Sequence, residues 1–345
     1  MKTILVIIYS MTQPNFARFA APTLLLALAL AGCSGEQPQS SNDGDISIVA
    51  STNVYGDIAA SIAGDSATVT SFITNPAQDP HEYEASAQDR LALDKADVVV
   101  KNGGGFDPFM EALLESGKAQ PAILDAVEIS GLAPHDDEES EEHADEEPAD
   151  EEHEGEEHAD EDEHAHIEGF NEHVWYDFGT MAKVAKALGA ELSELDPDHA
   201  SEYTANVATF TKSVAALERT AQKLKASADG RGVAITEPVP VYLLDAGGLV
   251  NHTPDAFSEA VEEGADVPPR VLKETLDLFG GSEDIAVLAY NAQTADGTTE
   301  QIRDAAEAAD VPVVDFTETL PKGKSYVAWQ QDNLGRLTEA LAKRG

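Results

Sequence analysis

Two histidines and two glutamates stand where a chain that alternates strands and helices places its ligand-binding groups. His81 follows a predicted strand at 67–72, and His173 lies just before a predicted helix. Glu237 and Glu318 each come after a predicted strand in the second half of the chain. Because ligands of open parallel sheets gather outside the carboxyl ends of the strands, these side chains can meet in one cleft. Imidazole nitrogen and carboxylate oxygen are suitable donors for zinc, so the set is a candidate metal site.

Spacing alone leaves other roles open for these residues. His81 can equally cap a helix or bond a neighbouring carboxylate, and Glu237 can be a solvated surface residue. Asn102 ends the apolar run Val98–Val100 and is a candidate residue of the second shell, behind the ligands themselves.

A second group of histidines lies in an acidic stretch at 135–168. The stretch holds 20 acidic residues, six histidines and no Lys or Arg. With so few apolar residues it cannot offset its chain entropy, and we predict that it is disordered. Imidazoles spaced through carboxylates favour weak capture of several divalent ions, and they favour zinc over manganese. A solubilising acidic loop is the alternative interpretation. The auxiliary capture residues are His143, His153, His158, His164 and His166.

The composition excludes several classes of protein. The chain has 345 residues and a formal net charge of −44, which would repel a nucleic-acid backbone over the whole surface. Outside 135–168, 45 acidic residues still exceed the 21 basic ones, so the folded part is acidic too. A single cysteine rules out a disulfide framework and a cysteine-ligated zinc or iron–sulfur site.

The N-terminal residues predict export and membrane anchoring. An apolar run at 23–30 is too short to span a bilayer but fits the core of a signal peptide. It ends in Leu30-Ala31-Gly32-Cys33, which resembles the lipoprotein box in which the cysteine is acylated. We therefore predict a signal peptide at 1–32, a lipid anchor on Cys33 and a flexible tether at 33–45, with the protein held at the outer face of the bacterial cytoplasmic membrane.

The remaining pattern predicts an α/β fold of two lobes, each with a parallel sheet flanked by helices. The lobes are expected at 46–195 and 229–345. They are joined by a helix at 196–228 of about 30 residues, roughly 45 Å long, which suits a rigid strut. Predicted strands are 46–51, 67–72, 98–100, 122–124, 232–236, 285–289 and 311–316, and further predicted helices are 54–62, 85–95, 108–116, 178–188, 298–309 and 329–343.

Three motifs give the mature chain a family resemblance. Asp79-Pro80-His81 precedes a helix, Asn171-Glu172-His173-Val174-Trp175 follows the histidine-rich stretch, and Thr317-Glu318-Thr319-Leu320 follows the last strand. With the long helix, they resemble the metal-binding solute receptors of ABC importers, the ZnuA/TroA-like zinc and manganese receptors. The resemblance implies a receptor, not an enzyme, that captures metal and delivers it to a membrane permease and its ATPase. It also implies a monomer.

The same resemblance assigns the metal ligands. The first two carry over to His81 and His173, and the third to Glu237, where family members have His or, in manganese-type members, Glu. At the fourth position Glu318 replaces the usual Asp, and Asp315 is a nearby alternative. The implied cargo is Zn²⁺, with Mn²⁺ as the alternative.

Two other functions remain open from the sequence. A zinc metallohydrolase would need a general base such as Glu82 or Glu172, but no His-Glu-x-x-His motif or nucleophile elbow is present. A metal-buffering protein or adhesin at the cell surface, with no permease partner, is the third hypothesis.

Overall fold

The computed structural model describes residues 46–134, 167, 169–280 and 284–344. The predicted signal peptide, Cys33, the tether and all five capture histidines lie outside these residues, so the predictions about them stay predictions. None of the described helices is long and apolar enough to cross a membrane.

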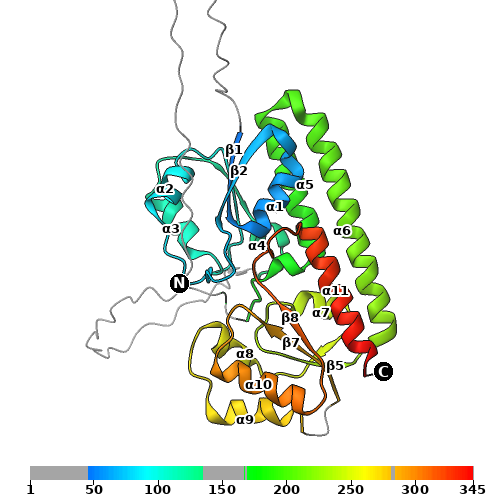
Figure 1. Ribbon diagram of the computed structural model, residues 1–345. Coiled ribbons are helices and arrows are strands. Elements are labelled where there is room, and N and C mark those ends of the chain that lie inside the picture. Colours follow the sequence, from blue (N-terminus) through cyan, green and yellow to red (C-terminus); the bar gives the residue numbers. More distant parts are fainter. Residues whose placement is uncertain (1–45, 135–166, 168, 281–283, 345) are drawn as a thin grey trace, which may run out of the picture. The chain divides into compact units, whose positions relative to one another are not determined.

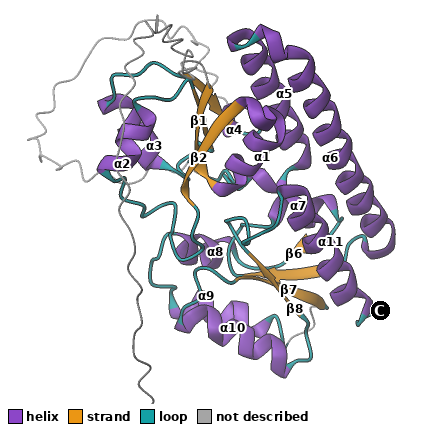
Figure 2. Cartoon of the chain, turned by 45° about the horizontal axis from the view of Figure 1, so that its top comes forward, coloured by secondary structure: helices purple, strands orange, loops and turns teal. Residues whose placement is uncertain are grey.

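The first lobe is built on a parallel sheet with the strand order β2-β1-β3-β4. Every residue of β3 and nearly every residue of β1 is buried, as expected for central strands covered on both faces (Figures 1 and 2). The strands are β1 (Ile46–Thr52), β2 (Ala67–Ile73), β3 (Val98–Lys101) and β4 (Ala122–Asp125), and the helices are α1 (Asn53–Ala63), α2 (Ala87–Leu93), α3 (Pro108–Ser116) and α4 (Ala126–Ser130).

The second lobe repeats this architecture with the strand order β6-β5-β7-β8, also parallel. All seven residues of β7 are buried. The two parallel sheets confirm the predicted fold class. The strands are β5 (Gly232–Ile235), β6 (Val250–Asn251), β7 (Ile285–Asn291) and β8 (Val313–Phe316), and the helices are α7 (Val241–Ala246), α8 (Asp255–Glu262), α9 (Pro269–Asp277) and α10 (Gly297–Ala308).

Two long helices, α6 (Ala200–Ala228) and α11 (Tyr326–Ala342), contact both lobes, and α5 (Phe178–Leu195) packs against α6 on the first lobe. The strut α6 has 29 residues and runs alongside both lobes, with α5 and α11 packed against it (Figure 1). From Phe210 on, its buried side chains follow each other at three- and four-residue spacing, and Tyr203 comes two turns earlier, so one apolar stripe faces the rest of the protein. The buried residues are Tyr203, Phe210, Val214, Leu217, Ala221, Leu224 and Ala228.

The lobes are also tied together directly. One apolar core runs from β1 in the first lobe to α11 at the end of the second. The Asn53 side chain both donates to Leu320 O (2.9 Å) and accepts from Leu320 N (2.8 Å). The Tyr326 hydroxyl donates to Trp175 O across the same boundary (2.7 Å). Separating the lobes would break these contacts, so a wide hinge opening is costly.

Some elements differ from the prediction. Helix α2 is shorter, because the Ser86 side chain caps it and pairs with Asp89 in a capping box. Helix α11 starts at Tyr326, three residues early, where Ser325 caps it. The range 238–284 had no predicted element but contains α7, β6, α8 and α9. These elements have between two and nine residues, and a proline directly precedes each of the three helices, so their sequence resembles a loop.

Candidate metal centre

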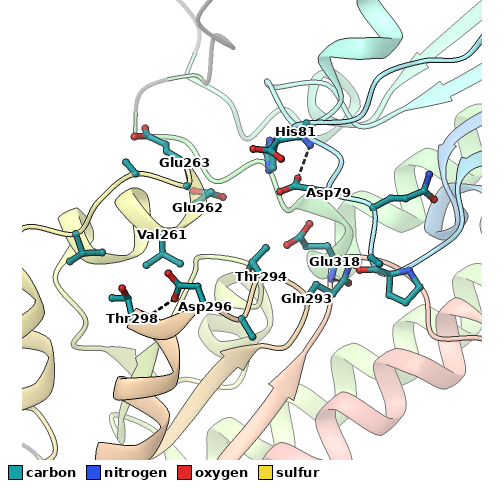
Figure 3. Close-up of a pocket in the computed structure, with 18 of the residues that line it drawn as sticks. Asp79, His81, Val261, Glu262, Glu263, Gln293, Thr294, Asp296, Thr298 and Glu318 are labelled. Carbon is teal, nitrogen blue, oxygen red and sulfur yellow. Dashed lines mark hydrogen bonds between the residues drawn. The ribbon is translucent and has the colours of Figure 1, made fainter.

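His81 lies in a cavity of about 840 Å³ that both lobes line (Figure 3). It sits in the loop after β2, where its backbone N–H donates to Asp79 Oδ1 (2.9 Å) and fixes the Asp-Pro-His turn. The opposite wall includes Glu262 and Glu318 from the second lobe. Among the described residues that line the cavity, none is Lys or Arg.

His173 is not among the described residues that line the cavity, and it is only 1% exposed. Its Nδ1 lies 2.8 Å from Asn171 Oδ1, and its backbone N–H donates to the same oxygen (3.1 Å). The Asn171 amide nitrogen donates to Pro238 O (3.0 Å), which fixes the orientation of the amide. Nδ1 therefore carries the proton, and Nε2 keeps its lone pair for a metal.

Asn102 supports His173 through the backbone. It is fully buried, and its side-chain nitrogen donates to Glu172 O (2.9 Å) and Gly103 O (2.8 Å). Its side-chain oxygen accepts from the Tyr55 hydroxyl. Asn102 therefore positions the residue preceding His173, as a residue of the second shell would.

A phenylalanine separates the two imidazoles from the interior of the first lobe. The Phe106 ring centroid lies 5.1 Å from that of His81 and 5.8 Å from that of His173, both in edge-to-face geometry. Trp175 packs against His173 at 5.0 Å. This aromatic wall keeps water from one side of the imidazoles and limits their rotation.

Glu262 joins the two histidines, and the sequence analysis missed it. One ligand atom each from His81, His173 and Glu262 lie within 4.8 Å of one another, close enough to share one ion. Glu262 Oε1 lies 3.5 Å from His173 Nδ1. Glu262 is the last residue of α8. The four-residue spacing of Phe257 and Val261 was the available sign of that helix, but nothing in the sequence indicates which way it points.

Glu237 and Glu318 form a separate pair. The side-chain nitrogen of Asn291, at the end of β7, donates to Glu237 Oε2 (2.8 Å) and to Glu318 Oε1 (2.7 Å). The hydroxyl of Thr294 donates to Glu237 Oε1. Gln293 accepts from the backbone N–H of Glu318 (2.7 Å) and reaches Pro76 O in the first lobe (2.9 Å).

Burial and mutual repulsion shift these carboxyl groups. Burial and, after it, repulsion by the nearby Glu237 raise the pKa of Glu318 to about 8, although the hydrogen bond from Asn291 lowers it. Burial also raises the pKa of Glu237, and it raises that of Glu262 well above its usual range, with Glu172 as the next cause. Crowded buried carboxylates without a cationic side chain are stabilised by protons or by a bound cation.

Glu318 and Asp315, the two candidates for the fourth ligand, have different surroundings. The Asp315 carboxylate pairs with Arg303 on α10 (3.2 Å), and that guanidinium lies over the Tyr290 ring at 4.7 Å. Glu318 is 3% exposed and lines the cavity. The structure thus brings His81 and His173 together, places Glu318 in the same cavity, and links Glu237 to Glu318 through Asn291.

Comparison with known proteins gives the family. Residues 48–340 match the family described as the periplasmic component A of the zinc-uptake complex, ZnuA. The manganese-binding lipoprotein MntA of Halalkalibacterium halodurans is 30% identical over 58% of this chain and 57% of its own length. The manganese ABC transporter substrate-binding lipoprotein scaA of Streptococcus gordonii is 24% identical over 94% of this chain and 99% of its own. The solved structure of the periplasmic zinc-binding protein TroA from Treponema pallidum aligns with a TM-score of 0.62 at 20% identity, over 86% of this chain and 99% of its own.

Proposed function

This chain belongs to the ZnuA family of periplasmic zinc-uptake components. We propose that its cleft binds a divalent transition-metal ion and that this ion is zinc. The chain is a substrate-binding protein of a metal ABC importer, and such receptors are not enzymes. The metallohydrolase hypothesis is therefore set aside. The ion is cargo that the protein binds and gives up unchanged.

One observation carries the proposal: ligand atoms of His81, His173 and Glu262 lie within 4.8 Å of one another beside a cavity that both lobes line. Two neutral nitrogens and a carboxylate oxygen at that spacing suit a first-row divalent ion. A dication would also offset the repulsion among the buried carboxylates, which have no cationic side chain beside them in the described cavity wall.

We assign four ligand positions to the bound ion: His81 and His173 from the first lobe, and Glu237 and Glu318 from the second. The Asn291 amide holds the two glutamates next to each other, and Glu318 lines the same cavity as His81. Asn102 and Asn171 hold the His173 loop in place. The shared core and the hydrogen bonds between lobes favour release through local loop movement on docking to the permease.

Zinc is the first candidate and manganese the alternative. The two imidazoles favour zinc, and zinc outcompetes manganese at most nitrogen and oxygen sites. Two relatives that carry the word manganese in their names support the alternative. Cellular availability of the two ions then decides which cargo is carried.

The remaining features follow from this role. We propose a lipid anchor on Cys33 that tethers a monomeric receptor outside the cytoplasmic membrane, beside its permease and ATPase. The histidines of 135–168 would raise the local concentration of metal near the cleft.

Calorimetric titration of metal-free protein with Zn²⁺ and with Mn²⁺ tests the proposal. A variant without residues 135–166 serves as the titrated protein, so that weak binding by the histidine-rich stretch does not mask the cleft. We expect one tight site per chain for zinc and weaker binding of manganese. Absence of any one-to-one binding of either ion would reject the function.

A further inference from the structure

Glu262 differs from the other two carboxylates of the second lobe in its surroundings. Glu237 and Glu318 both accept hydrogen bonds from Asn291. Glu262 Oε1 is buried and accepts no hydrogen bond from the described residues, although it lies 3.5 Å from His173 Nδ1. Burying a carboxylate oxygen without a donor is costly, so an ion at this point would supply the missing interaction.

The position of Glu262 is set by the fold. Phe257 of α8 is fully buried in the apolar cluster of the second lobe, which anchors the helix. The chain then turns back on itself, with Gly264 N–H donating to Val261 O (3.1 Å) and Ala265 N–H to Ala260 O (2.8 Å). This arrangement directs Glu262 from the second lobe toward His81 in the first, as Figure 3 shows.

We propose that Glu262 is a direct ligand of the ion held by His81 and His173, and that it widens the choice of cargo toward Mn²⁺. This inference rests on the proposed function. With Glu237 and Glu318, it gives the site three carboxylates and two imidazoles, an oxygen-rich set of more than four donors.

The preferences of the two ions make Glu262 more important for one than for the other. Zinc is satisfied by four donors in a tetrahedron, so two imidazoles and two carboxylates already complete its shell. Manganese favours oxygen donors and an octahedral shell. A third carboxylate therefore adds more to the affinity for Mn²⁺ than to the affinity for Zn²⁺. It reduces the difference in affinity by which a site with two nitrogen donors favours zinc.

The test compares Glu262→Gln with Glu259→Gln. Both substitutions replace a carboxyl group of α8 by an amide and keep the side-chain shape, but Glu259 is exposed and does not line the cavity. Dissociation constants for Zn²⁺ and Mn²⁺ are measured by competition with a chelator, and the bound Mn²⁺ is followed by electron paramagnetic resonance. Melting temperatures of the metal-free variants show that each one folds.

We expect Glu262→Gln to weaken Mn²⁺ binding by at least about tenfold and Zn²⁺ binding by clearly less. The resonance spectrum of bound Mn²⁺ should change in this variant only. If Glu262→Gln matches Glu259→Gln for both ions, Glu262 is not a ligand. An equal loss for both ions would overturn its role in cargo choice. Wild-type protein that binds neither ion would instead reject the proposed function itself.

Discussion

The two lobes hold the donor groups of the metal centre in different ways. The first lobe supplies two imidazoles that pack around Phe106, and the amide of Asn171 fixes the imidazole of His173. The second lobe supplies carboxylates, which repel one another and share the amide of Asn291. Contacts within the first lobe hold the imidazoles, whereas a bound cation would offset the repulsion among the carboxylates of the second lobe.

This difference separates the roles of the two lobes. Rigid imidazoles set where the ion sits, because the aromatic wall and the loop hydrogen bonds fix them beforehand. The carboxylates determine how much of the positive charge of the ion is neutralised and how many oxygen donors coordinate it. Substitutions that remove the imidazoles of the first lobe should abolish metal binding, and substitutions of the carboxylates in the second lobe should change the affinity.

The largest effect is expected when the imidazole half is removed. His81→Ala alone should lower zinc affinity at least about tenfold, because the ion loses one of its nitrogen donors. The double variant with His173→Ala should show no zinc binding in the cleft by calorimetry. His199→Ala is the control, because His199 pairs with Asp196 at the start of the strut. Unchanged titration curves for His81→Ala would remove that residue from the site.

The first half of the site was also the easier one to predict. His81 and His173 lie in the Asp-Pro-His and Asn-Glu-His-Val-Trp motifs, and the resemblance of these motifs to the metal receptors assigned both residues as ligands. The parallel sheets could be predicted because runs such as Val98–Val100 are apolar on both faces. The strut could be predicted because its apolar stripe continues for 29 residues.

The second half depends on contacts that no local pattern contains. Helix α8 has eight residues, and its last one approaches His173 only after the chain has folded. Our preference for Glu318 over Asp315 as the fourth ligand rests on the ion pair between Asp315 and Arg303, which lies on another element. Asn291 becomes visible as the link between two glutamates only when the ends of β5, β7 and β8 meet.

A smaller effect is expected from the carboxylate half. Glu318→Gln should lower zinc affinity by about tenfold or less, because the amide oxygen keeps a weak donor in place while the charge is lost. Asp315→Asn should leave zinc affinity unchanged, since Asp315 pairs with Arg303. Calorimetry on both variants tests which of the two residues is the fourth ligand. A larger loss of zinc affinity for Asp315→Asn than for Glu318→Gln would identify Asp315 as the ligand.

The smallest effect concerns the stability of the metal-free protein against pH, and it isolates the carboxylate half without any ion. Burial raises the pKa of Glu318 to about 8 from an ordinary value of 4.5. Between these two values the folded protein holds a proton that the unfolded chain has released. The folded state is therefore stabilised at low pH, and its free energy of unfolding falls as pH rises across this window.

Thermal melts between pH 5 and 8 measure this slope. For metal-free protein we expect the melting temperature to fall by a few degrees as pH rises, and less so in Glu318→Gln, which has no proton to lose at that position. Saturating zinc should flatten or reverse the slope, because the ion replaces the proton and binds more tightly as pH rises. Equal slopes in wild type and Glu318→Gln would mean that the Glu318 carboxyl is not under strain in the metal-free state. The contrast between a relaxed imidazole half and a repelling carboxylate half would then depend on Glu237 and Glu262 alone.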